Sequence, residues 1–159
     1  MSNLGTPEVK AIEEAYEAVR NDKDETTWML VTAAKGNKLS LTRTGTDKSF
    51  VTPGDDDNAI TRLTEALDDS EIQYGYARVE YANDSESTRV KFIMVTWMGP
   101  SAGIMRRAKV GADAGEVQQK ILRHYSKELR TDDKHDLKPD YIVKELRRSG
   151  GADYNGGRG

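Results

Sequence analysis

Apolar residues recur at intervals of three or four in three segments of the chain, a spacing typical of amphipathic helices. Before the first, Thr6 is a suitable N-cap and Pro7 occupies the first helical position. Before the second, the carboxylates of residues 55–57 supply the N-cap and compensate the helix dipole. The third begins near Pro139 and is stopped by the glycines at 150–151. The periodic residues are Val9, Ile12, Tyr16 and Val19, then Ile60, Leu63 and Leu67, then Tyr141, Ile142 and Leu146.

Two pairs of shorter apolar segments predict β-hairpins. Residues 28–34 and 38–44 flank a Lys-Gly-Asn-Lys turn, and residues 74–81 and 90–98 flank a turn at 82–85. The last of these strands, VKFIMVTWM, is apolar almost throughout. A strand without polar alternation is buried on both of its faces. We therefore expect helices on both sides of the sheet.

The chain returns to a helical composition after Gly99 and Pro100. Asp113 and Glu116 have the spacing of a capping box for the apolar residues that follow them, and either one long helix or two kinked helices fit this segment. The apolar residues are Val117, Ile121 and Tyr125. The resulting order of helix, hairpin, helix, hairpin and helices indicates an α/β domain with a mixed sheet between helices.

The length of 159 residues suits a single domain. We expect this domain to span residues 1–149, and we expect residues 150–159, which are rich in glycine, to form a flexible tail. The chain has no cysteine, which excludes disulfides, zinc-thiolate sites and a cysteine nucleophile. No signal sequence or apolar run of about 20 residues is present, so the sequence predicts a soluble cytoplasmic protein with no membrane partner.

Motifs for nucleotide, dinucleotide and zinc-protease sites are absent, and the carboxylates of residues 55–57 lack the alternate spacing of a calcium loop. His124 and His135 with the nearby aspartates make at most a weak metal patch. Aromatic residues do not alternate with basic ones as in single-strand binding surfaces, so nucleic acid is not an expected partner. The sequence predicts no cofactor and no metal.

One enzymatic alternative is a small serine hydrolase. Residues 99–103 read G-x-S-x-G between a buried strand and a helix, the context of a nucleophile elbow centred on Ser101. The later Asp132 or Asp133 and His135 keep the Ser, Asp, His order of α/β-hydrolases. Against this interpretation, that fold needs a large parallel sheet, and a proline beside the nucleophile is unsuited to a strained turn. The favoured interpretation is a protein without catalytic residues.

Charge is distributed unevenly along the chain. Residues 1–86 contain 9 Lys and Arg against 18 Asp and Glu, whereas residues 87–159 contain 15 against 9. Residues 87–112 hold five basic residues and no acidic one: Arg89, Lys91, Arg106, Arg107 and Lys109. Five like charges without acids are favourable when an external acidic partner neutralises them, although a solvated face also explains such a run. The alternation of a strand and the spacing of a helix allow all five to form one basic surface.

The adjoining segments KFIMVTW and MGPSAGIMRRAKVGAD carry a family resemblance. They are similar to the signature of the coactosin family, a branch of the actin-depolymerising-factor (ADF) homology proteins that include cofilin. The resemblance continues in EEAYEAVRND, in QYGYARVEYANDSESTRVKF and in VKELRRSGGADYNGG, so it covers essentially the whole chain. It implies a single ADF-homology domain with a five- or six-stranded mixed sheet sandwiched between helices.

The resemblance also implies a function. Members of the family bind actin filaments without catalysis or cofactor, which would place this chain on the cytoskeleton. The helix after the tryptophan strand docks on actin, and its basic positions correspond here to Arg106, Arg107 and Lys109. A lysine that opens the signature strand corresponds to Lys91, with Arg89 as its neighbour. Coactosins bind the filament side and either stabilise filaments or interfere with capping, and the alternative is monomer binding or severing of the cofilin kind.

Overall fold

The structure, a computed structural model, describes residues 7–34, 38–110, 116–117 and 120–149. The segment 150–159, expected to be a tail, lies outside these residues, and so does Asp113 of the expected capping box. In chain order the elements are α1 (Pro7–Arg20), β1 (Trp28–Ala34), β2 (Lys38–Gly45), α2 (Ala59–Ala66), β3 (Ile72–Asp84), β4 (Ser87–Met98), α3 (Ile104–Ala108), β5 (Lys127–Thr131), the 3₁₀ helix η2 (Lys134–Leu137) and α5 (Pro139–Ser149).

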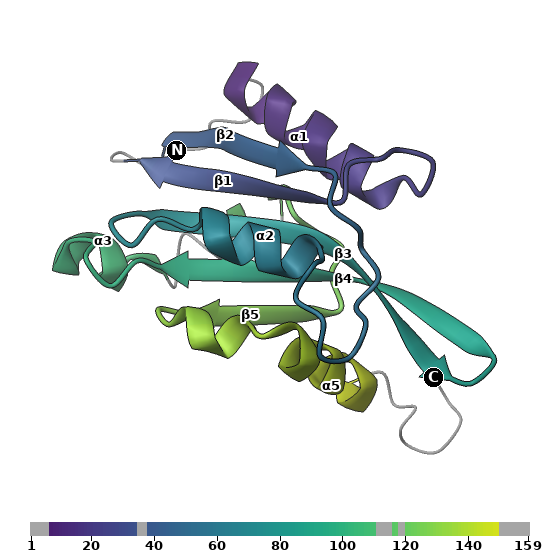
Figure 1. Ribbon diagram of the computed structural model, residues 1–159. Helices are drawn as coiled ribbons and strands as arrows, with labels where there is room; N and C mark the ends of the chain where they lie inside the picture. Colours follow the sequence, from purple (N-terminus) through teal and green to yellow (C-terminus); the bar gives the residue numbers. More distant parts are fainter. Residues whose placement is uncertain (1–6, 35–37, 111–115, 118–119, 150–159) are drawn as a thin grey trace.

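The strands form one five-stranded sheet in the order β2-β1-β3-β4-β5 (Figure 1). All neighbours are antiparallel except β4 and β5, which run parallel. The sheet is therefore mixed, as expected. Both predicted hairpins are present, and β3 and β4 pair from Ile72 opposite Met98 to Asp84 opposite Ser87.

The central strand β4 is buried on both faces, which confirms the prediction from its unbroken apolar sequence. Ile93, Val95 and Trp97 belong to a core cluster with residues of α2 and α5. Met94 points the other way, into a second cluster formed with α1 and with the segment that contains Val110, Val117 and Leu122. Side chains alternate between the faces of a strand, so one strand serves both cores. Helices thus cover both sides of the sheet.

Four local features differ from the sequence predictions. The N-cap of α2 is Asn58, whose side chain accepts from the backbone N–H of Thr61, and the aspartates precede it. The turn between β3 and β4 lies at residues 85–86. Tyr125 follows the helical segment and does not belong to it. Tyr141 lies on the outer side of α5, 47% exposed.

Strand β5 was not expected from the hydrophobic pattern. Its sequence KELRT has a single large apolar residue, Leu129, and is only five residues long. It is held by parallel pairing with β4, where Lys127 lies opposite Ile93 and Thr131 opposite Trp97. Such pairing depends on residues distant in sequence, which a local pattern does not reveal.

The β3–β4 hairpin projects from one end of the sheet, and α3 lies at the other end (Figure 1). The chain leaves β4 at Gly99, whose N–H donates to the carbonyl of Glu71 at 2.9 Å. A Cβ at Gly99 would lie 2.3 Å from the backbone oxygen of Asp69, so only glycine fits without displacing that loop. The glycine that opens the G-x-S-x-G sequence thus serves a close backbone approach.

Candidate binding surface at the two ends of strand β4

The basic residues of α3 are partly engaged within the chain. The guanidinium of Arg106 donates to the backbone oxygen of Ala33 at 2.8 Å and pairs with Glu71 at 3.2 Å. Arg107 pairs with Asp132 at 2.8 Å. Both arginines therefore have acidic neighbours, which the run of basic residues in the sequence did not indicate. Their first role is to hold α3 against the sheet.

The exposed part of this segment combines two apolar side chains with a lysine. Ile104 and Met105, at the start of α3, are 83% and 74% exposed. Lys109 follows the helix, is exposed and makes no ion pair with any residue that the structure describes. Large apolar side chains that lie together and are exposed to this degree are typical of interaction surfaces. We call Ile104, Met105 and Lys109 the helix cluster.

A second group of basic residues lies on the projecting hairpin. Arg89 is opposite Tyr81 and Lys91 is opposite Val79 in the β3–β4 ladder. Directly opposite residues share a face, and Tyr81 and Val79 face the core that contains α5. Arg89 and Lys91 therefore share one face, as predicted, and neither forms an ion pair with another described residue.

Helix α5 adds a third cation to this group. Arg147 donates to the backbone oxygen of Ala82 at 2.6 Å, and its guanidinium lies 5.5 Å from the centre of the Tyr81 ring. Arg89 is the cross-strand neighbour of Tyr81, so Arg147 lies near the start of β4. We call Arg89, Lys91 and Arg147 the hairpin cluster.

The turn of the hairpin is fixed by Asp84. Its carboxylate accepts from the backbone N–H of Glu86 at 2.9 Å and from the hydroxyl of Ser87 at 3.0 Å. These hydrogen bonds lower the pKa of Asp84, and the nearby charge of Arg89 contributes a smaller part. The bonds hold the turn at the tip of the hairpin, three residues before Arg89.

The five predicted residues do not form one surface. Arg89 lies near the start of β4, and α3 follows its end at Met98. At about 3.3 Å of rise per residue, Arg89 and Met98 are roughly 30 Å apart. Arg106 reaches Ala33 and Glu71, which are at the same end of the sheet as Met98. The expectation of a single basic surface is therefore wrong, because the length of β4 separates its two halves (Figure 1).

Sequence reasoning missed Arg147, Ile104 and Met105 as surface residues. The arginines at 147–148 occupy the last turn of α5, where cations also compensate the helix dipole, so their presence was not diagnostic. Ile104 and Met105 could have been predicted as surface residues. Two large apolar residues directly before two arginines fit neither a buried helix face nor a fully solvated one.

Among the described residues, the side chains of the hydrolase alternative are not joined into a hydrogen-bonded triad. Ser101 is exposed, and its N–H donates to the backbone oxygen of Asp69 at 2.8 Å. His135 instead contacts Asp133, with 2.9 Å between its Nδ1 and Oδ1, and its side chain is 85% exposed. Within the described residues, no hydrogen bond joins Ser101 to a histidine.

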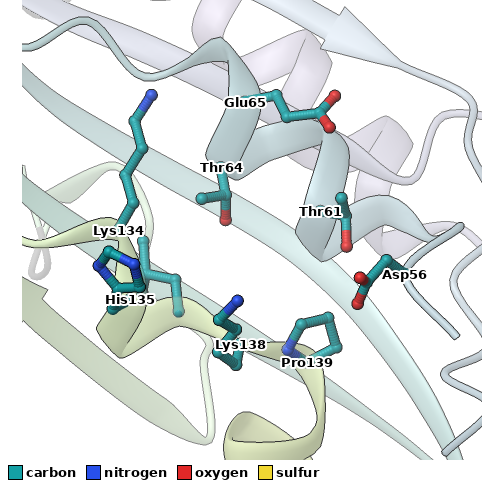
Figure 2. A pocket seen from close by; sticks show the side chains of 9 residues that line it. Asp56, Thr61, Thr64, Glu65, Lys134, His135, Lys138 and Pro139 are labelled. Carbon is teal, nitrogen blue, oxygen red and sulfur yellow. The ribbon is translucent and has the colours of Figure 1, made fainter. Parts of the chain in front are cut away.

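Helices α2 and η2 enclose a hollow of about 200 Å³. Figure 2 shows Lys134, His135 and Lys138 across it from Thr61 and Thr64 of α2. Asp56 and Glu65 also line it, so it carries both signs of charge and favours no ligand of a single charge. Across the described ranges, no three His, Asp or Glu side chains gather closely enough to hold a metal ion.

No helix in the described part of the chain is long and apolar enough to cross a membrane.

A profile of cofilin/tropomyosin-type actin-binding proteins matches residues 5–147. Coactosin of Dictyostelium discoideum is 28% identical over 159 residues, which cover 99% of this chain and 98% of that protein. The human coactosin-like protein is 27% identical over 146 residues and 92% of each chain.

Solved structures agree with these relatives. A crystal structure of the human coactosin-like protein superposes with a TM-score of 0.71 at 24% identity, covering 87% of this chain and 95% of the other. The solution structure of mouse coactosin, described as an actin filament binding protein, gives 0.66 at 26% identity, with 91% and 92% covered. This chain belongs to the cofilin/tropomyosin-type family of actin-binding proteins, and coactosins are among its relatives.

Proposed function

We propose that this chain binds the sides of actin filaments through two separate contacts, the helix cluster and the hairpin cluster, and does so without catalysis. The proposal is supported by membership of an actin-binding family and by the resemblance to mouse coactosin, an actin filament binding protein. The observation that carries it is the exposure of Ile104 and Met105 at one end of β4, with the cations of the hairpin cluster at the other.

The two contacts have different chemistry. Ile104 and Met105 suit an apolar groove, where removal of their surface from water is favourable. Lys109 lies beside them and suits an acidic rim. In the hairpin cluster, the cations suit carboxylates through charge-assisted hydrogen bonds. Contacts roughly 30 Å apart favour an extended partner surface, such as a polymer, over a small ligand.

The predicted contact residues acquire separate roles in this proposal. Arg89, Lys91 and Lys109 contact the filament directly. Arg106 and Arg107 act first by holding α3, since their charges are shared with Glu71 and Asp132. Binding along the filament side would associate the protein with the cytoskeleton in the cytoplasm, and would stabilise filaments or interfere with capping.

Cosedimentation with filamentous actin across a series of salt concentrations tests this function. The protein should pellet with filaments, less so as salt rises, because exposed ion pairs are screened. The amount of actin in the pellet should not fall. A shift of actin to the supernatant would instead indicate monomer binding or severing of the cofilin kind, and a protein that stays in the supernatant at low salt would contradict actin binding. Ser101→Ala should pellet like the parent chain.

A further inference from the structure

We propose that Ser149 is a site of phosphorylation by an arginine-directed serine/threonine kinase, and that a phosphate there weakens filament binding by the hairpin cluster. The second half of this statement rests on the proposed function. Ser149 is the last residue of α5 and is exposed. Its hydroxyl donates to the backbone oxygen of Glu145 at 3.0 Å. The site thus combines an accessible hydroxyl with a position next to the hairpin cluster.

The residues before Ser149 provide the recognition element. Arg147 and Arg148 precede it directly, and no other serine in the sequence follows two arginines. Kinases select substrates partly by such charge patterns around the acceptor residue. Arg148 is exposed and is bonded to Glu145 at 2.7 Å. A kinase whose substrate groove is acidic would replace this ion pair with its own carboxylates, while the mostly buried carboxylate of Glu145 keeps its pair with Lys127 at 3.6 Å.

Access requires only the end of α5 to open. Leu146 is buried at 1% exposure and anchors the helix, whereas the three residues after it are exposed. Helix ends fray readily, since their last carbonyl groups lack helical partners. The segment 147–149 can therefore extend into a kinase groove while the core contacts of α5 remain.

The chemistry of the step is a transfer of the γ-phosphoryl group of ATP. A bond forms between the Ser149 oxygen and the γ-phosphorus, the bond from that phosphorus to the β,γ-bridging oxygen breaks, and ADP leaves. The hydroxyl proton passes to the carboxylate base of the kinase. The product carries about −1.5 to −2 charges at neutral pH. Without its proton, the Ser149 oxygen can no longer donate to the carbonyl of Glu145.

Two consequences follow for the hairpin cluster. A negative group at a helix C-terminus opposes the helix dipole, so the last turn of α5 becomes less stable. That turn contains Arg147, whose bond to Ala82 and contact with Tyr81 join α5 to the hairpin. The phosphate also offers Arg147 and Arg148 an anionic partner within the chain. The first effect loosens the position of Arg147, and the second neutralises part of the charge of the two arginines. Both leave less positive charge in place to contact an acidic filament.

The site assignment is tested without actin. The full chain is incubated with Mg-ATP and the catalytic subunit of cyclic-AMP-dependent kinase, an arginine-directed enzyme, and phosphate is located by peptide mass spectrometry. One phosphate on Ser149 is expected, none on Ser149→Ala, and unchanged incorporation into Ser70→Ala, which removes an exposed serine that follows aspartate. Phosphate on another residue, or none, would overturn the assignment.

The regulatory effect is then measured by cosedimentation. The chain phosphorylated on Ser149 should bind filaments roughly tenfold more weakly than the untreated chain, because electrostatic complementarity is lost. Ser149→Ala exposed to the same kinase should keep its affinity. Unchanged binding by the phosphorylated chain would overturn the regulatory claim, whereas failure of the untreated chain to bind would count against the proposed function instead. The mass measurement stands in either case.

Discussion

The guanidinium of Arg106 donates to the backbone oxygen of Ala33 at 2.8 Å and so joins α3 to the end of β1. It also pairs with Glu71 at 3.2 Å. Arg106→Ala should therefore lower the free energy of unfolding by about 1–3 kcal/mol, since hydrogen bonds from a charged donor are lost. Filament affinity should fall as well, because α3 loses its anchor. Urea denaturation measures the first effect, and Lys109→Ala, which removes an exposed cation nearby, should leave stability unchanged. Equal stability of Arg106→Ala and the parent chain would contradict the anchoring role.

The exposed apolar pair of α3 predicts a loss of binding without a loss of stability. Ile104→Ala and Met105→Ala remove side chains that are mostly in solvent, so the melting temperature should not change. Each should weaken filament binding by roughly tenfold, the effect of about 1.4 kcal/mol, when the side chain fills an apolar groove. Tyr141→Ser is the matched control, an exposed apolar residue on α5. If Tyr141→Ser weakened binding as much as the α3 variants, the apolar contact would not be specific to α3.

Arg78 is a buried cation whose replacement should be costly. Its guanidinium donates to the backbone oxygen of Val19, in the last turn of α1, at 2.9 Å and to that of Asn21, just after α1, at 2.7 Å. Arg78→Met would leave the buried oxygen of Val19 without this donor, whereas the oxygen of Asn21 still accepts from the N–H of Asp24 at 2.9 Å; the change should cost about 2–4 kcal/mol in thermal or urea unfolding. Arg62→Met, which breaks three partly exposed ion pairs, should cost less than about 1 kcal/mol. The reverse ranking of the two variants would contradict this account.

The sequence predicted both hairpins and the burial of β4 because these depend on local patterns. The strand Trp28–Ala34 was predicted with its correct bounds. The apolar run at Ile93–Trp97 predicted correctly that both faces of the sheet are covered. Strand β5 was missed because Leu129 is its one large apolar residue, and its edge position comes from pairing with β4.

The sequence predicted correctly that Arg89 and Lys91 lie on one face of β4, because side chains alternate strictly along a strand. The partners of Arg106 and Arg107 could not be predicted. Glu71 and Asp132 are 35 and 25 residues away in sequence, so only the folded chain brings them together. The distance between the two clusters likewise depends on where α3 packs after Gly99.

Acid should destabilise the fold because ionised aspartates accept the hydrogen bonds that hold some of its turns. The backbone N–H of Thr26 donates to Asp24 at 2.9 Å, and this bond is the main reason that the pKa of Asp24 lies below its ordinary value of 3.8. A carboxylate with a lowered folded pKa stabilises the fold above its unfolded pKa, and this stabilisation is lost as the pH falls through the folded pKa. The free energy of unfolding should therefore fall between about pH 5 and about pH 2.

Asp24→Ala should make that acid dependence shallower. Urea denaturation of the variant and the parent chain at each pH measures the difference. Asp22→Ala is the control, because it removes an exposed carboxylate that accepts no hydrogen bond from a described residue. If Asp24→Ala and the parent chain lost stability in parallel as the pH falls, the turn at Asp24 would not contribute to acid sensitivity.

The account as a whole depends on two contacts at opposite ends of β4. Cosedimentation with actin filaments should be measured for Lys91→Ala, Lys109→Ala, their double variant and Lys10→Ala, which removes an exposed lysine from α1. Each of the first two should weaken binding, and because distant sites behave independently, their free-energy losses should add in the double variant. Lys10→Ala should bind like the parent chain. A folded double variant that pellets as well as the parent chain would contradict the proposed surface.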